Sequence, residues 1–168
     1  EVLQDRAAEA LALLDKTNRD RNMILVLEEI RLEQAATNSE EGRFAQIEVI
    51  PKYQTAFVKY GLDENTLSSD RAAKQIQACS PVMRKSLIAG LDEWCRLETA
   101  VTKDSDGKTQ RCQWIAAVIS ETDSNPWRNQ ARRAMQEKDF EALRSLCKSV
   151  DVSNETHYPC RSRGVHGC

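Results

Sequence analysis

The sequence predicts an all-α protein of six or seven helices, arranged as stacked antiparallel pairs behind a long N-terminal helix. Apolar residues recur at intervals of three and four along most of the chain, the period of a helix with one buried face. The 168 residues include only 6 Gly and 4 Pro, which leaves long stretches without a helix breaker. Ser80 and Asn125 each precede a proline, a pairing typical of helix starts.

The first predicted element runs from Val2 to Gln34. Its apolar residues keep helical spacing, with charged residues between them. The segment "KTNRD" interrupts the apolar series, so the sequence allows either one long helix or two helices that meet there. The apolar members are Leu3, Ala7, Ala10, Leu11, Leu14, Met23, Leu27 and Ile30.

A second helix is expected after Gly42 and should end at Tyr60. Gly61 follows directly and suits a C-terminal stop, because glycine adopts positive φ without a steric cost. Pro51 lies inside the apolar series and removes one backbone hydrogen bond, which predicts a kink or a restart at that point. The apolar residues are Phe44, Ile47, Ile50, Phe57 and Tyr60.

A loop, "LDENTLSSD", leads to a short helix that Ser68 or Ser69 caps and that ends near Cys79. The next helix has the strongest start, because Ser80 can accept a hydrogen bond from an orphan amide and Pro81 fits the first helical position. Its apolar stripe consists of Val82, Leu87, Leu91 and Trp94, with Ile88 and Cys95 beside it.

After the polar break "TKDSDGKTQ", a helix is predicted around Cys112 and Ile115. The stretch "NPWRNQARRAMQEKDFEALRSLC" then predicts a tight helical hairpin, with Pro126 in the first turn and Trp127 as a bulky core anchor. We expect three parts: residues 1–40 as an N-terminal helix or helix pair, 41–151 as a helical array, and 152–168 as a loose tail without helical period.

Composition excludes several classes of function. The formal net charge is -2 and the pI is about 5.8, so the chain lacks the basic footprint that a nucleic-acid partner needs. The longest aliphatic run, Met23 to Leu27, is far shorter than a membrane span. Single cysteines among apolar positions indicate a reducing, cytoplasmic setting. The chain begins at Glu1, and we expect it to be a piece of a longer polypeptide.

Patterns that would hold a metal are incomplete. "DSDG" invites a calcium loop, but placing Gly107 sixth puts Thr102 first and Gln113 twelfth, where carboxylates are required. The tail carries zinc-capable residues at spacings that match no closed structural site we can name. These four residues are His157, Cys160, His166 and Cys168.

Catalytic patterns are also missing. The sequence has no glycine-rich phosphate loop, and neither histidine stands near a sequence pattern for a Ser or Cys nucleophile. Asp92 and Glu93 are adjacent on a helix and point about 100° apart, which favours two solvated carboxylates over an acid/base pair. We expect no catalytic, cofactor-binding or metal site in this chain.

Four stretches in order carry a resemblance: "LEEIRLEQA…EEGRF", "YQTAFVKYGLD", "SPVMRKSLIAGLDEW" and "NPWRNQARRAMQEKDFEALRSL". Together they resemble the helical region of planctomycete-type serine/threonine protein kinases, which lies between the kinase domain and tetratricopeptide repeats. The similarity covers roughly residues 26 to 150 and stops after Asp151. The positions that match are interpreted as structural anchors, chiefly Tyr60, Gly61, Pro81, Leu91, Trp94, Pro126 and Trp127, together with Leu62, Asp63 and Asp92.

The resemblance implies a tetratricopeptide-like helical array in a cytoplasmic signalling protein whose kinase domain lies N-terminal to Glu1. The chain itself has no "HRD", "DFG" or nucleotide-covering glycine loop. We therefore expect a non-catalytic scaffold that binds a protein partner, and neither nucleic acid nor membrane. The alternative is a small regulator that binds zinc through its Cys/His tail. Neither the partner nor the oligomeric state follows from the sequence.

Overall fold

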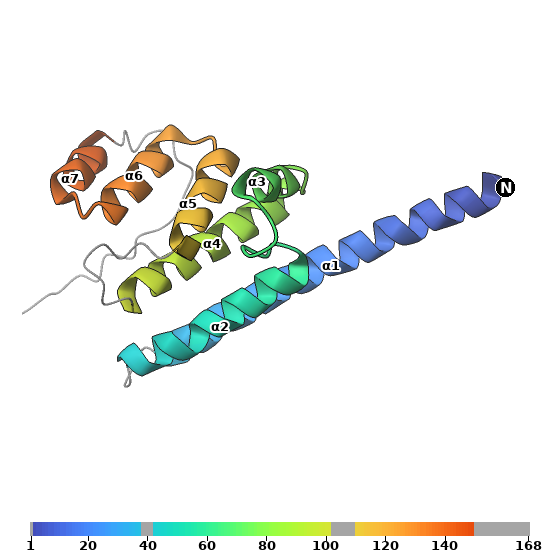
Figure 1. Cartoon of the computed structure of the whole chain (residues 1–168), viewed down its shortest axis with the longest axis horizontal. Helices are drawn as coiled ribbons and strands as arrows, with labels where there is room; N and C mark the ends of the chain where they lie inside the picture. Colours follow the sequence, from blue (N-terminus) through green and yellow to red (C-terminus); the bar gives the residue numbers. More distant parts are fainter. Residues whose placement is uncertain (1, 38–41, 102–109, 150–168) are drawn as a thin grey trace, which may run out of the picture. The chain divides into compact units, whose positions relative to one another are not determined.

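The computed structural model describes residues 2–37, 42–101 and 110–149, and these residues form helices and connecting turns (Figure 1). The prediction of an all-helical protein with a long N-terminal helix is confirmed. The described helices are α1 (Val2–Thr37), α2 (Gly42–Tyr60), α3 (Ser69–Gln77), α4 (Pro81–Val101), α5 (Gln110–Thr122), α6 (Pro126–Gln136) and α7 (Phe140–Ser149).

The chain divides into two compact units, residues 1–124 and 125–168. The first unit contains α1 to α5, and the second contains α6 and α7. The three parts predicted from the sequence, 1–40, 41–151 and 152–168, stay predictions, and the last of them lies outside the described residues.

Helices α1 and α2 settle two questions that the sequence left open. α1 is one helix of 36 residues that passes through "KTNRD" without a break. α2 is also uninterrupted, and Pro51 lies inside it, so the predicted restart is wrong. One missing amide hydrogen bond is not enough to end this helix. The Thr55 hydroxyl also donates to the Pro51 carbonyl oxygen at 2.8 Å.

The turn after α2 forms as glycine chemistry predicts. Gly61 has φ +98°, in the left-handed region that glycine adopts most readily. The Leu62 amide donates to the Phe57 carbonyl at 2.9 Å, and the Gly61 amide donates to the Val58 carbonyl at 3.0 Å. These bonds satisfy two carbonyls at the helix end, and they turn the fully buried Leu62 into the core.

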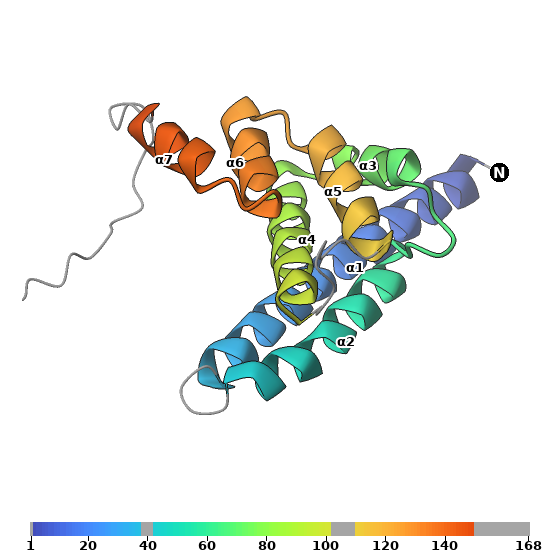
Figure 2. The same cartoon turned by 60° about the vertical axis from the view of Figure 1, so that its left-hand side comes forward.

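Helix α4 is the centre of the first unit and contacts α1, α2, α3 and α5 (Figure 2). Pro81 is its first residue, and the Ser80 hydroxyl accepts a hydrogen bond from the Met83 amide at 3.3 Å. α3 packs mainly on α5. The side chains of α4 that form the middle of the core are Met83, Leu87, Leu91, Trp94 and Leu97.

Gly90 allows α4 to approach α1 and α2 closely. A Cβ atom at this position would lie 3.0 Å from Leu27 Cδ2 and 3.2 Å from Phe57 Cζ, which is closer than carbon atoms normally pack. The absence of a side chain at Gly90 therefore sets the spacing at which α4 crosses the other two helices.

The second unit is a helical hairpin. Side chains cap the start of each helix, and few of its described residues are buried. The Asn125 side chain accepts from the Arg128 amide at 3.0 Å, with Pro126 in the first turn of α6. Asp139 Oδ1 accepts from the Ala142 amide at 2.9 Å at the start of α7. Ala134 is the only buried residue of α6, and α7 has none.

Candidate interaction surface on the N-terminal helix

Helix α1 has two apolar faces. One face packs into the first unit through Met23, Leu27 and Ile30, each at most 5% exposed. The other face carries an outer stripe, which we define as Leu11, Leu14, Leu25 and Leu32. These four side chains are 55–70% exposed. In the second half of α1, the described residues therefore cover one face and leave the other in solvent.

Helix geometry explains why the two sets lie apart. Each residue advances the helix by about 100°, so the nine residues from Leu14 to Met23 amount to about 900°, half a turn out of phase. The eleven residues from Leu14 to Leu25 return to within about 20° of the same face. The apolar residues of α1 follow one another as a single series in the sequence, but their phase around the helix separates them into two faces.

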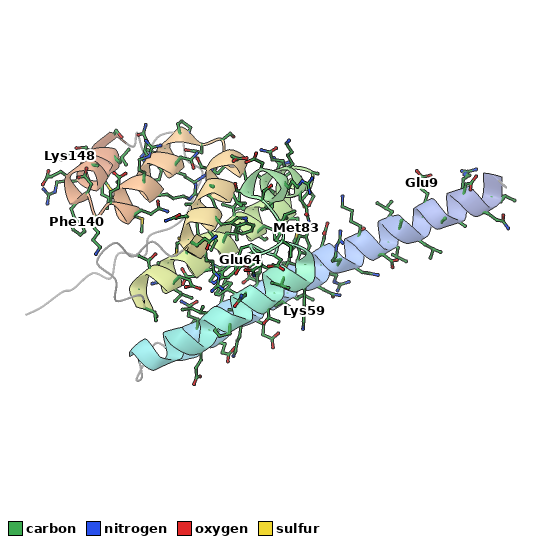
Figure 3. All side chains as sticks on the ribbon, in the orientation of Figure 1. Glu9, Lys59, Glu64, Met83, Phe140 and Lys148 are labelled. Carbon is green, nitrogen blue, oxygen red and sulfur yellow. The ribbon has the colours of Figure 1, made fainter. Side chains whose placement is uncertain are left out.

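The first half of α1 has no cover in the described structure. Residues 3–19 are all exposed, and this part of the helix extends past the end of α2 (Figure 1). Figure 3 labels Glu9 on this part, far along α1 from Lys59 at the end of α2. Leu3, at 81%, and Leu13, at 66%, are also exposed here.

Tyr60 marks the point where packing of α1 begins. Its hydroxyl donates to Asp20 Oδ1 at 2.7 Å and lies 3.4 Å from Cys79 Sγ. The guanidinium of Arg19 lies over the ring, 5.6 Å from its centroid. Burial, together with the bonds to Cys79 and Asp20, raises the pKa of Tyr60 above its usual value. Tyr60 thus ties α1 to α2 and to the turn between α3 and α4.

A groove of about 890 Å³ runs between α1 and α2. Its apolar lining includes Met23, Val26, Ile30, Pro51 and Ala56. Basic groups, Arg19 and Lys59, line the groove near Tyr60, and acidic groups line the part where the Lys52 ammonium pairs with Glu33. The acidic residues of the lining are Asp15, Glu29, Glu33 and Glu48, so acidic side chains are not confined to one part of the groove.

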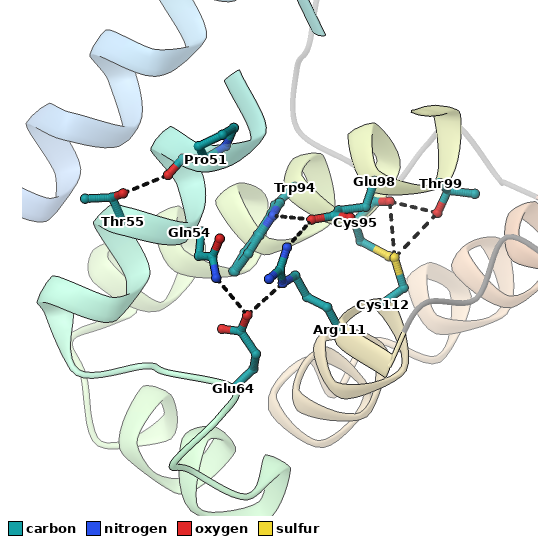
Figure 4. Close-up of polar contacts among 10 residues, drawn as sticks. All are labelled: Pro51, Gln54, Thr55, Glu64, Trp94, Cys95, Glu98, Thr99, Arg111 and Cys112. Atoms are coloured by element: carbon teal, nitrogen blue, oxygen red, sulfur yellow. Dashed lines mark hydrogen bonds and ion pairs between the residues drawn. The ribbon is translucent and has the colours of Figure 1, made fainter. Parts of the chain in front are cut away.

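A cluster of polar contacts in the first unit surrounds Trp94 (Figure 4). The Arg111 guanidinium donates to Glu98 Oε1 at 2.6 Å and to Glu64 Oε1 at 2.7 Å. The Trp94 indole donates to Glu98 Oε1 at 3.3 Å, and Arg111 lies 5.4 Å from the Trp94 ring. The cluster joins the loop after α2 to α4 and α5.

This cluster has the chemistry of a structural tie. Burial alone would lower the pKa of Arg111, but its bonds to Glu98 and Glu64 raise that pKa above the usual value, so the guanidinium stays charged. Trp94 is fully buried and stacks on Phe57 with ring centroids 5.4 Å apart. Glu64 Oε2 is a buried oxygen without a hydrogen-bond partner among the described residues.

The anchors predicted from the sequence occupy different positions in the fold. Tyr60, Gly61, Pro81, Leu91 and Trp94 belong to the first unit, where Leu91 and Trp94 are fully buried and Tyr60 is 4% exposed. They support different contacts and do not converge on one cavity.

Pro126 and Trp127 belong to the second unit. The Trp127 indole donates to the Leu146 carbonyl oxygen of α7 at 3.3 Å. The side chain keeps 38% of its surface exposed, which differs from the buried core position that we expected. A short hairpin has too few neighbouring side chains to enclose an indole.

The residues considered for metal binding are not all described. The tail residues His157, Cys160, His166 and Cys168 lie outside the described part of the chain, as does Gly107 of the calcium pattern. Within the described residues, no group of three His, Cys, Asp or Glu side chains is arranged to hold a metal ion.

Of the adjacent carboxylates Asp92 and Glu93 on α4, Glu93 is held in place by hydrogen bonds. It accepts hydrogen bonds from Gln34 of α1 at 2.5 Å and from Arg96 at 2.6 Å. Burial opposes ionisation, but these bonds together lower the pKa of Glu93 below its usual value. The carboxylate therefore joins α4 to α1 in its ionised form.

Sequence reasoning missed Arg111, Glu64 and Glu98. Arg111 is 47 residues from Glu64 and 13 from Glu98, and no local spacing connects them. Their meeting depends on how α5 packs against α4 and the loop, so only the three-dimensional arrangement reveals it.

The chain matches no family model, no curated protein and no solved structure. The resemblance to the kinase helical region therefore stays a prediction from the residues that carry it. Among the helices that the structure describes, none is both long enough and apolar enough to cross a membrane.

Proposed function

We propose that this chain is a non-catalytic helical scaffold of a cytoplasmic bacterial serine/threonine protein kinase, and that α1 provides its contact with a protein partner. The observation that carries the proposal is the outer stripe of α1. Its four leucines are 55–70% exposed along one face of a single helix. An aligned apolar surface of this kind is typical of a protein interaction site.

The charged side chains in the first unit form hydrogen bonds and ion pairs with one another, which supports the proposed role as a scaffold. Glu98 and Glu64 bind Arg111, and Glu93 binds Arg96 and Gln34. The Arg111 contacts join α5 to α4 and to the loop after α2, and the contact between Glu93 and Gln34 joins α4 to α1. The buried thiols of Cys79, Cys95 and Cys112 fit the reducing setting that belongs to this proposal.

The resemblance supplies the kinase part of the proposal and the tetratricopeptide-like stacking. The stretches that carry it contain the turn at Gly61, the start of α4 at Pro81 and the start of α6 at Pro126. Each of these positions begins or ends a helix. The residues that carry the resemblance therefore include positions that set helix boundaries in this chain.

The coding sequence upstream of Glu1 tests this proposal. A kinase domain with "HRD" and "DFG" motifs in the same reading frame is the expected result. Phosphate transfer from ATP should then require that domain and should be absent when residues 1–168 are expressed alone. An upstream frame without kinase motifs, or transfer by residues 1–168 alone, would contradict the proposal.

A further inference from the structure

We propose that the outer stripe of α1 binds a second copy of this chain, with the two α1 helices antiparallel around a two-fold axis. This inference names the partner of the scaffold described above and rests on that proposed function only for the role of α1 as the contact element. Its physical basis is the arrangement of residues along the stripe.

The stripe has the repeat of a coiled-coil seam. Leu11, Leu14, Leu25 and Leu32 fall on positions that alternate by three and four residues, and Asn18 occupies the same line between them. The full seam from Gln4 to Ala35 covers more than four heptads, and six of its ten positions are leucine or alanine, residues that can pack in a helix–helix contact.

The inner face of α1 does not compete for this contact. Met23, Leu27 and Ile30 are already buried against the first unit, and they lie about half a turn away from the outer stripe. A second helix can therefore pack on the outer stripe while the first unit stays as it is.

Charges within the seam select the orientation. A parallel, in-register pair would place Arg21 against Arg21 and Glu28 against Glu28, and like charges at facing core positions oppose association. An antiparallel pair centred between Asn18 and Arg21 removes both of these contacts, because Arg21 then faces Asn18 of the other copy.

Side-chain sizes agree with the antiparallel arrangement. Leu14 of one copy faces Leu25 of the other, and Leu32 faces the smaller Ala7. Leu11 faces Glu28, whose carboxylate is already paired with Arg31 at 2.9 Å on the helix surface. The same surface serves both copies, as a two-fold interface requires.

The arrangement also accounts for the uncovered first half of α1. Residues 3–19, all exposed in the single chain, would lie along the second half of the partner's α1. Because only about half of the seam positions are leucine or alanine, the contact should be weak, so that monomer and dimer exchange as the protein is diluted.

Sedimentation equilibrium on residues 1–168 over a wide range of concentration tests the proposal. The wild type should approach twice the 19.0 kDa of one chain at the highest concentrations. Leu14→Lys should weaken dimerisation about tenfold or more, because the charge faces Leu25 of the partner. Leu13→Glu is the matched control, since Leu13 is similarly exposed on the same helix but lies off the stripe, and it should dimerise like the wild type.

A charge pair tests the orientation. In the antiparallel dimer, Leu14→Lys with Leu25→Glu in one chain brings opposite charges together twice, so the double variant should dimerise more tightly than either single variant. In a parallel dimer the same double variant places like charges together and should be the weakest of the three. Circular dichroism confirms that each variant keeps its helices.

Three results would overturn the inference: a wild type that stays monomeric at all concentrations, a Leu13→Glu variant that loses as much affinity as Leu14→Lys, or a double variant weaker than both singles. None of these results bears on the proposed kinase parent, which the coding sequence upstream of Glu1 tests. The two proposals can therefore fail separately.

Discussion

The two halves of α1 form the same kind of helix under opposite conditions. In the second half, Met23, Leu27 and Ile30 are buried by α2 and α4. In the first half, residues 3–19 are all exposed. The comparison shows that one continuous helix can depend on tertiary packing at one end and on intrinsic preference at the other.

Residue choice explains why the first half is helical at all. It is rich in alanine and leucine, including Ala7, Ala8, Ala10 and Leu11, and these residues have the highest helix propensities. In proteins, however, most of the stability of a helix comes from tertiary packing of its apolar face. The exposed leucines therefore suggest that a partner supplies the stabilisation that α2 and α4 supply to the second half.

Paired leucine truncations should show the largest difference between the halves. Leu27→Ala should lower the free energy of unfolding by about 2–5 kcal/mol, because it leaves a cavity at a residue that is 2% exposed. Leu11→Ala, at 62% exposed, should change it by less than about 0.5 kcal/mol. Urea denaturation at low protein concentration measures both; similar losses would mean that the first half is packed in the monomer.

Gly90→Ala should have the next largest effect. The added methyl group would lie 3.0–3.2 Å from atoms of Leu27 and Phe57, and overpacking of this kind costs about 1–3 kcal/mol. Higher helix propensity offsets about 1 kcal/mol of this cost, so a net loss of up to about 2 kcal/mol is expected.

A protein that already carries Leu27→Ala provides the control for the predicted effect of Gly90→Ala. Removing the Leu27 side chain makes room for the methyl group, so Gly90→Ala should cost less there than in the wild type. An equal cost in both backgrounds, or a stabilised Gly90→Ala protein, would show that α4 does not press on the packed half of α1.

Tyr60→Phe should loosen the boundary between the two halves. The variant loses the 2.7 Å hydrogen bond to Asp20, and unfolding free energy should fall by about 1 kcal/mol. Amide exchange should increase most near Asp20. A double-mutant cycle with Asp20→Ala isolates the contact, and a coupling energy near zero would mean that Tyr60 does not hold α1 through its hydroxyl.

Tyr53→Phe should have the smallest effect at neutral pH, because the Tyr53 hydroxyl is buried without a hydrogen-bond partner among the described residues. Burial raises the pKa of Tyr53 from 10.0 to about 12. The unfolded chain therefore releases this proton first, and wild-type stability should fall as the pH rises from 10 towards 12. The Phe variant should lose less stability over this range; identical pH profiles would contradict the assignment.

Local chemistry made several features predictable from the sequence. Ser80 with Pro81 starts α4, Gly61 ends α2 with φ +98°, and Asn125 with Pro126 starts α6. Each of these signals acts within a few residues, because it satisfies backbone groups at one helix end. The sequence contains all the atoms involved, so no knowledge of distant packing is needed.

Features that depend on distant packing were not predictable in the same way. Trp94 and Trp127 both received the role of core anchor, yet one is fully buried and the other is 38% exposed. The difference reflects how many helices surround each indole. The Arg111 cluster and the continuity of α2 through Pro51 depend likewise on packing that residue spacing does not encode.

The two faces of α1 are an intermediate case. Helix phase alone separates Leu14 from Met23, so the existence of two apolar faces follows from the sequence once the angle is counted. Which face packs inside the monomer does not follow, because that depends on the position of α2 and α4. The existence of the outer stripe is therefore predictable from the sequence, but its exposure in the folded chain is not.

Hydrogen–deuterium exchange of α1 as a function of protein concentration shows whether a second copy covers the first half of this helix. The packed half, from Met23 onward, should be protected at every concentration. The first half, residues 3–19, should exchange quickly in dilute protein and become protected as concentration rises, in the wild type but not in Leu14→Lys. Exchange in the first half that does not depend on concentration, or that is unchanged by Leu14→Lys, would contradict the account.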